Sequence, residues 1–391
     1  MRQNRIVPFG ILIAYSFLAL TGIFYRLEVF SLNVNQLIYL IPCLALFAFI
    51  FMRSHFFVSK NIIFPLAILS VFLCLHLFFS GFSFELHARF FLSLLPLIFA
   101  RQFVNALSYP SNKAMYLLYK VYLFAIFLGL GAAFLQYSGF MSFRDFDYVD
   151  GMRVGRISGF YEKPVIFIIT LLPLFYRITL YQRFIFRSLI LIIFAVIIYH
   201  SGHRTSLLAF VFCVPIVLAP KYLYRFLKNN YVPALYLMCT ISLVLGLELL
   251  NSIPGAYLLR GRLEMWLAHW SEVRDSLMFL TFGKGQQTLE HATQMSYTVY
   301  DVNEVHGDFV RVLKVYGIFG IILILNLLSR YQTILKLTYG PQKSLPLIYI
   351  SGIFLLCFSL TNEPTYYPAI FWHLTVGVAF ILEIARRKSA N

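Results

Sequence analysis

Long apolar runs separated by short polar breaks constrain the fold of this chain more than any other feature. A helix that crosses a bilayer needs about 20 mostly apolar residues, and the chain contains runs close to that length from end to end. They lie at 6–25, 34–52, 62–80, 89–104, 115–137, 164–180, 187–201, 205–220, 231–251, 308–328, 344–360 and 367–385. Composition agrees, since 60% of the 391 residues are hydrophobic and only 12% are charged. We predict an all-α polytopic membrane protein of about 12 transmembrane helices, with residues 1–391 forming one integral membrane domain.

Lysine and arginine are divided unequally between the two sides that these spans define. The side with both termini has 19 of the 32 basic residues and a single acid, Glu383. The other side has 13 basic residues and 15 acids. Because cytoplasmic loops are enriched in Lys and Arg, both termini are expected to be cytoplasmic. The formal charge of +16 also suits nucleic acid, but its division between two membrane faces predicts no such partner.

Two polar segments on the outer side interrupt the apolar pattern, a loop at 138–163 and a larger one at 252–305. Cations cluster on this side, although outer faces normally avoid them. They are Arg144, Arg153, Arg156, Lys163, Arg204, Arg260, Arg262, Arg274, Lys284 and Arg311. Internal salt bridges are one explanation for any single arginine. For the set we favour an anionic ligand, because guanidinium groups bind phosphate and carboxylate with two parallel hydrogen bonds.

Four motifs in the interval 144–320 resemble, in their order, those of the O-antigen polymerase and ligase superfamily. The motifs are Arg156-Ile-Ser-Gly159-Phe-Tyr-Glu-Lys-Pro164, similar to a Gly-Phe-x-x-Pro entry into a span; Ser201-Gly-His-Arg204-Thr-Ser206, similar to a Ser-Arg-Thr corner; Gly261-Arg262-x-x-x-Trp266 followed by Gly283-Lys-Gly285; and His306 followed after ten residues by Gly317. The chain departs from the family in one place. The family often has Asn after the histidine, whereas Gly307 and Asp308 follow it here.

The resemblance implies a C-type glycosyltransferase fold with a large helical periplasmic loop, in the bacterial inner membrane and with a periplasmic active site. Its substrate would be an oligosaccharide linked to undecaprenyl pyrophosphate. The other expected partners are membrane lipid and a chain-length regulator protein. No cofactor or metal is expected.

Arginines would stabilise the leaving pyrophosphate, and a base would activate the attacking hydroxyl. The predicted pyrophosphate- or glycan-binding residues are Arg204, Arg262, Arg274, Arg156, Arg311, Arg153 and Tyr161. His306 is the predicted base, since imidazole titrates near neutral pH, and Glu304 and Asp308 are the alternatives. If 306–311 is helical, Asp308 and Arg311 lie three apart and can pair.

The pair Asp145 and Asp147 could bind a divalent cation, but we expect these acids to neutralise Arg144 and Arg153. His76, inside an apolar run, is interpreted as packing.

The resemblance implies a polymerase that extends a lipid-linked glycan, which we favour on Asp308 after His306-Gly307 and on the turn Asn362-Glu363-Pro364. The alternative is a ligase that transfers the finished glycan to lipid A core, and the alternative from another class is a flippase or transporter of the same lipid. The lack of an internal repeat and the gathering of charge at one face favour a transferase.

Overall fold

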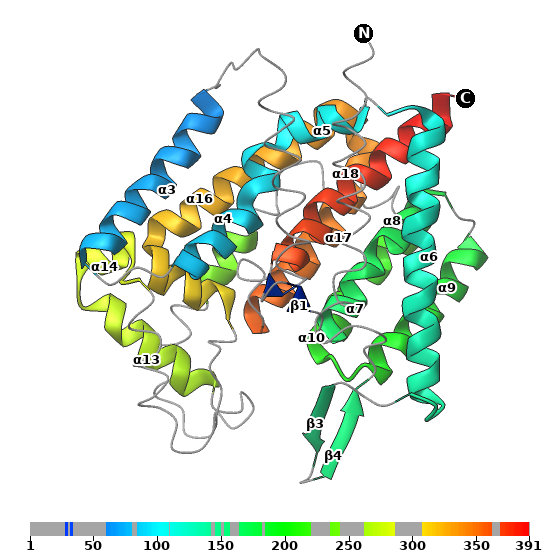
Figure 1. Ribbon diagram of the computed structural model, residues 1–391, viewed down its shortest axis with the longest axis horizontal. Helices are drawn as coiled ribbons and strands as arrows, with labels where there is room; N and C mark the ends of the chain where they lie inside the picture. Colours follow the sequence, from blue (N-terminus) through cyan, green and yellow to red (C-terminus); the bar gives the residue numbers. More distant parts are fainter. Residues whose placement is uncertain are drawn as a thin grey trace.

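α-Helices make up nearly all of the structure, a computed structural model shown in Figure 1. It describes residues 28–29, 32–33, 60–79, 84–108, 110–141, 145–149, 152–156, 164–181, 184–219, 235–242, 262–285, 307–361 and 368–390. The helices are α3 (Lys60–Phe79), α4 (Phe84–Ile98), α5 (Ala100–Ser108), α6 (Asn112–Tyr137), α7 (Pro164–Thr170), α8 (Leu172–Tyr181), α9 (Phe184–His200), α10 (Arg204–Leu218), α13 (Arg262–Arg274), α14 (Leu277–Phe282), α16 (Asp308–Tyr339), α17 (Pro341–Thr361) and α18 (Pro368–Ala390). Two short antiparallel pairs are β1 (Glu28–Val29) with β2 (Leu32–Asn33), and β3 (Asp145–Val149) with β4 (Met152–Arg156).

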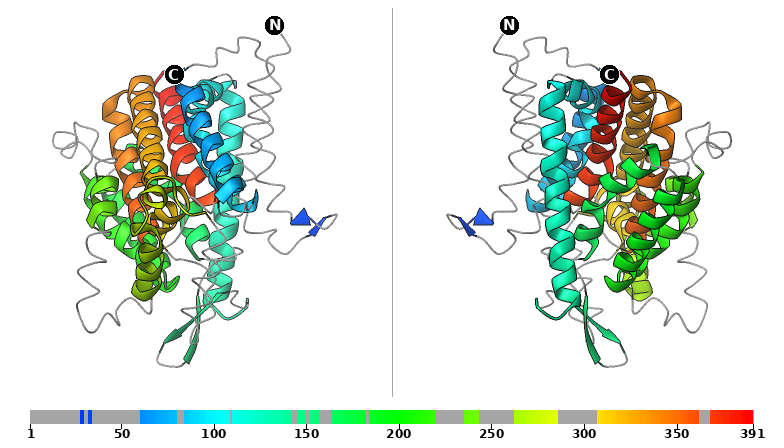
Figure 2. Two further views of the ribbon diagram at one scale, coloured as in Figure 1. Left: turned by 90° about the vertical axis from the view of Figure 1, so that its left-hand side faces the viewer. Right: turned by 90° about the vertical axis from the view of Figure 1, so that its right-hand side faces the viewer.

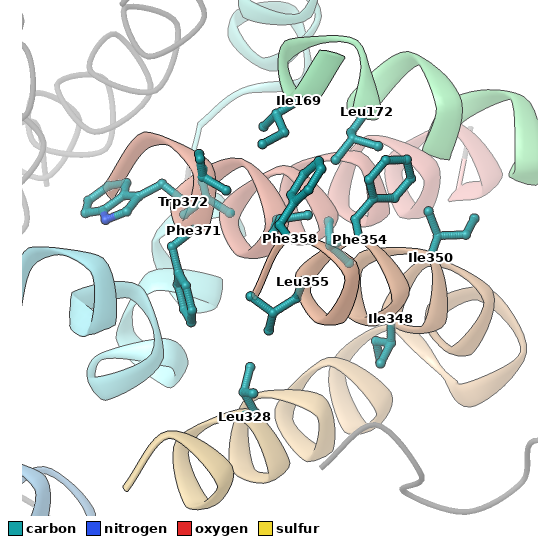
Figure 3. Packing of buried hydrophobic residues seen from close by; sticks show 14 of the residues in the cluster. Ile169, Leu172, Leu328, Ile348, Ile350, Phe354, Leu355, Phe358, Phe371 and Trp372 are labelled. Atoms are coloured by element: carbon teal, nitrogen blue, oxygen red, sulfur yellow. The ribbon is translucent and has the colours of Figure 1, made fainter. Parts of the chain in front are cut away.

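The core lies where α16, α17 and α18 pack together, and α17 also packs against α10. Side chains from α7, α8 and these three helices meet there, as Figure 3 shows for Ile169, Leu172, Leu328, Phe354 and Phe371. All five are nearly inaccessible to solvent. Helices buried this thoroughly are apolar on most of their faces, which explains why their sequences have no clear amphipathic stripe.

Three helices of the described residues are long and apolar enough to cross a membrane: Asn112–Tyr137, Asp308–Tyr339 and Pro341–Leu360. Several shorter helices, such as Phe184–His200 and Arg204–Leu218, are equally apolar. The chain is therefore a helical membrane protein. The prediction of about 12 spans is only partly realised in this structure. The predicted spans 6–25 and 34–52 lie outside the described residues, and of 231–251 only 235–242 is described.

Two predicted spans are each divided in the structure. The run 89–104 becomes the end of α4 and the start of α5, and the run 164–180 becomes α7 and α8. Pro96 lies inside α4, three residues before the first break, and it cannot donate to the Leu92 carbonyl one turn earlier. The indole Nε1 of Trp372 donates to that carbonyl instead, at 2.7 Å. The free carbonyl of Thr170 at the second break similarly accepts from the Tyr122 hydroxyl at 2.9 Å.

The outer loops of the predicted topology lie at one end of the bundle. The β3–β4 hairpin belongs to the loop 138–163, and α13 and α14 are the described part of the loop 252–305. Figures 1 and 2 show these elements at the lower end, and α5 and the end of α18 at the upper end. At the upper end, Glu383 is fully buried and pairs with Arg387 at 2.7 Å and Arg386 at 2.9 Å. The one acid of the basic side is thus an internal counter-ion.

Candidate functional site

A tight corner joins α9 to α10 at the lower end of the bundle. Gly202 adopts a left-handed conformation with φ of 65°, which glycine reaches without steric cost. The next residue, His203, caps α10: its Nδ1 accepts from the Ser206 backbone at 3.2 Å and lies 2.6 Å from the Ser206 hydroxyl. An N-cap satisfies a backbone donor that the helix itself leaves open. His203 therefore fixes the direction in which α10 begins.

Arg156, at the end of β4, lies against this corner. A methyl group added at Gly202 would lie 3.5 Å from both Cγ and Nε of Arg156. Arg204 is the first residue of α10, two positions beyond Gly202, and its side chain is exposed. The hairpin register places Asp145 opposite Arg156. The first two motifs therefore meet, and they bring two of the predicted pyrophosphate-binding arginines to one corner.

The third and fourth motifs meet where α13 packs on the start of α16. Gly307 precedes α16, and a methyl group added there would lie 2.8 Å from the indole Nε1 of Trp266. Trp266 is itself buried. This contact fixes the backbone that follows His306 against α13.

The third and fourth motifs make a second contact further along α16, where Gly317 faces the end of α14. Gly317 interrupts α16 with φ of 64°, a conformation that lies outside the helical region. Its Cα faces the end of α14, so that a methyl group there would lie 2.7 Å from the Gly283 nitrogen and overlap the Thr281 carbonyl. The Lys284 amide donates to the Lys314 carbonyl at 2.7 Å. Irregular backbone at membrane depth needs this kind of coverage by protein.

A buried ionic cluster lies between these two contacts. Lys314 on α16 is 1% exposed, and its Nζ lies 2.8 Å from His269 Nδ1 and 3.1 Å from Glu272 Oε2 on α13. Glu272 also pairs with Lys284 at 3.4 Å. A buried ammonium is stable only with such partners. The cluster therefore depends on α13, α14 and α16 being in their observed places.

His269 is neutral in this environment. Its pKa is lowered from the usual 6.5 to about 3, because burial penalises the charged ring and because the cations Lys314 and Arg311 lie near it. The ring therefore stays uncharged at any physiological pH.

A buried histidine pair lies close to Tyr316, the residue before the break in α16. His76 of α3 and His87 of α4 approach within 2.6 Å through Nδ1 and Nε2. Both rings contact Tyr316, which stacks on Phe90 with ring centroids 4.0 Å apart. His76 is thus packed, as predicted, but it also has a polar partner that the sequence did not indicate.

The predicted site residues differ in how they are placed. Asp308 and Arg311 both lie on the first turn of α16 and are buried. Arg274 ends α13 and is exposed, with its Nε 3.5 Å from Asp275 Oδ1, so the salt-bridge explanation fits this residue. Some predicted residues lie outside the described part of the chain. These are His306, Glu304 and Tyr161, together with the side chains of Arg153 and Arg262, whose backbones lie in β4 and at the start of α13.

The sequence did not predict His269, Glu272 and Lys314 as members of a site. One signal was present: Lys314 is a cation inside an apolar run, and such residues are usually functional. It also continues a spacing of three from Asp308 and Arg311. His269 and Glu272 show the same spacing on α13, which places them on one helical face.

Comparison with known proteins does not identify a family for the chain. No family model matches the chain, and no curated protein matches it. Among the described residues, no group of three His, Cys, Asp or Glu side chains is placed to bind a metal ion.

Proposed function

We propose that the protein is a glycan polymerase of the O-antigen type in the bacterial inner membrane. It transfers a growing glycan from undecaprenyl pyrophosphate to the next lipid-linked repeat at the periplasmic face. One observation carries the proposal: motifs far apart in the sequence make direct contacts, Arg156 with the Gly202 corner, Trp266 with Gly307, and Gly283 with Gly317. The elements that carry these contacts, β4, α10, α13, α14 and the start of α16, are near the end of the bundle where the β3–β4 hairpin and α13 lie (Figure 1).

In the proposed reaction, a hydroxyl oxygen of the acceptor sugar attacks the anomeric carbon of the donor glycan. The new glycosidic bond forms as the bond from that carbon to the pyrophosphate oxygen breaks. His306 accepts the hydroxyl proton, and undecaprenyl pyrophosphate leaves with the bonding electrons. Arg204 and Arg156 compensate its negative charge, because fixed cations stabilise charge that develops in the transition state. Such a reaction needs no metal ion.

A transporter remains the alternative from another class, and the broken helix α16 is the observation in its favour, since transporters often bind substrate at broken helices. The charged residues argue against it. Asp308, Arg311 and Lys314 all precede the break at Gly317, on the side of α13 and α14. A flippase needs a polar path through the bilayer, whereas a transferase needs a pocket at one face.

The deciding experiment is lipopolysaccharide banding in a deletion strain. Loss of a polymerase leaves a core with one repeat, because the ligase still delivers single units. Loss of a ligase leaves a bare core and long lipid-linked glycan in the cell. We expect the first pattern, restored to a full ladder by the wild-type gene and not by His306→Ala at equal membrane level. A bare core would assign the ligase function instead, and an unchanged ladder in the deletion strain would reject both.

Arg204→Lys is expected to lose long glycan as well. A lysine ammonium keeps the charge but does not replace the two parallel hydrogen bonds of a guanidinium group, so the loss should be at least about tenfold in chain-extension rate. The matched control is Arg101→Lys, an exposed residue of α5 at the opposite end of the bundle. Normal glycan length in Arg204→Lys, with the protein at wild-type level, would exclude Arg204 from pyrophosphate binding.

A further inference from the structure

His269 has one ring nitrogen with a partner and one without. Its Nδ1 lies 2.8 Å from Lys314 Nζ. Its Nε2 is buried, and no described residue provides a hydrogen-bond partner for it. The side chain as a whole is 1% exposed. A buried polar atom without a partner is costly, and in a native protein it needs an explanation.

The partner of Nδ1 fixes which nitrogen carries the proton. A lysine ammonium has three hydrogens to donate and cannot accept, so Nδ1 of His269 is the acceptor. The neutral ring then has its single hydrogen on Nε2. The atom without a partner is therefore an N–H donor, and what is missing is an acceptor.

The charges around the ring indicate what kind of acceptor is suitable. Arg311 and Lys314 lie near His269. Lys284 pairs with the same oxygen of Glu272 as Lys314 does. Positive charges near a donor attract an anion and repel a further cation. The site is shielded from water, which strengthens such an interaction.

We propose that His269 is a ligand-binding residue, whose Nε2–H donates to a phosphoryl oxygen of the pyrophosphate donor. This inference rests on the proposed function for the identity of the anion. The arrangement of the ring, the ammonium and the free N–H is independent of it. Lys314 has a separate task, since it orients the ring and sets its tautomer.

Two substitutions separate the ligand contact from the Lys314 contact. The amide of asparagine reaches the position of Nδ1, so His269→Asn can still accept from Lys314 but presents no donor at Nε2. The amide of glutamine reaches the position of Nε2, so His269→Gln keeps that donor and loses the acceptor for Lys314. A residue with a purely structural role should tolerate Asn better than Gln. A residue that contacts the ligand should bind better as Gln than as Asn.

The measurement is binding of undecaprenyl pyrophosphate to purified protein in nanodiscs, followed by tryptophan fluorescence. Two of the three tryptophans, Trp266 and Trp270, flank His269 in the sequence. We expect His269→Asn to weaken binding about 10- to 100-fold, as for loss of a hydrogen bond to a charged group, with a melting temperature near that of the wild type. His269→Gln should bind within about threefold of the wild type and melt at a lower temperature.

The outcomes separate this inference from the function on which it rests. If the wild type does not bind undecaprenyl pyrophosphate, the proposed function fails and the inference fails with it. If the wild type binds and His269→Asn binds equally well, only the role of His269 is overturned. Should His269→Asn not be recovered from membranes, His269→Gln decides, because a tenfold loss of affinity in that variant contradicts the inference and unchanged affinity supports it.

Inorganic pyrophosphate serves as the second probe, in competition with the lipid. A weaker competition in His269→Asn than in the wild type shows that the phosphoryl group itself is contacted. Equal competition in the two proteins would place His269 against the lipid or the sugar and overturn the assignment.

Discussion

Gly317→Ala should leave almost no folded protein in the membrane. Two costs coincide at this position. A residue with a side chain at φ of 64° and ψ of −164°, a region essentially restricted to glycine, loses roughly 1–3 kcal/mol relative to glycine. The added methyl group would also lie 2.7 Å from the Gly283 nitrogen and overlap the Thr281 carbonyl. These are backbone atoms, so no rotation of a side chain relieves the overlap, and we expect a total destabilisation of about 3–5 kcal/mol. The measurement is the yield and melting temperature of detergent-solubilised protein by fluorescence-detected size exclusion.

The matched control for Gly317→Ala is Gly340→Ala. Gly340 also has a positive φ, of 80°, but no atom lies within 4 Å of where its Cβ would stand. This control isolates the conformational cost, and it should lower stability by about 1–3 kcal/mol. A Gly317→Ala protein as stable as Gly340→Ala would show that α14 does not press against the break in α16.

Uninterrupted apolar runs are the part of the fold that the sequence predicts well. The predicted spans 187–201 and 344–360 differ from α9 and α17 by a few residues at each end. The reason is that hydrophobicity over a window of this length is a local property. Breaks within a run are predicted poorly, because a helix breaks where a partner satisfies the freed backbone groups. The Trp372 indole that accommodates the break after Pro96 lies 280 residues from the carbonyl it binds.

The same distinction holds for the candidate site: residues in distinctive local motifs could be predicted, and contacts between distant segments could not. Arg156 and Arg204 could be selected because their short motifs resemble those of a known family and lie on the outer side of the predicted topology. The contact between Gly283 and Gly317 could not be predicted, since neither glycine indicates by its local sequence that the backbone of the other packs against it. The ionic cluster is similar: Lys314 is conspicuous in an apolar run, but its partners His269 and Glu272 lie on a polar helix where such residues are ordinary. Only the packing of α13 on α16 gives them a role.

The buried cluster leads to a prediction with a specific order of effects. Glu272→Gln removes a carboxylate that lies 3.1 Å from Lys314 Nζ. The ammonium then stays 1% exposed without this carboxylate, and its neighbour His269, 2.8 Å away, is a neutral imidazole. Removing one partner of a buried ion pair costs about 3–5 kcal/mol. Because Glu272 is itself 23% exposed, we expect the lower part of that range, measured as a drop in melting temperature.

Lys314→Met should be much milder, because the carboxylate that remains is still paired with Lys284 at 3.4 Å. Methionine also fills the volume of the lysine stem with apolar atoms. The double variant Glu272→Gln with Lys314→Met should therefore be more stable than Glu272→Gln alone, since it removes the buried charge whose ion pair with Glu272 was broken. Melting temperatures of the four proteins form a double-mutant cycle, which isolates the interaction of the pair. If the two losses simply add, Lys314 and Glu272 are not coupled, and the ionic cluster does not tie α13 to α16.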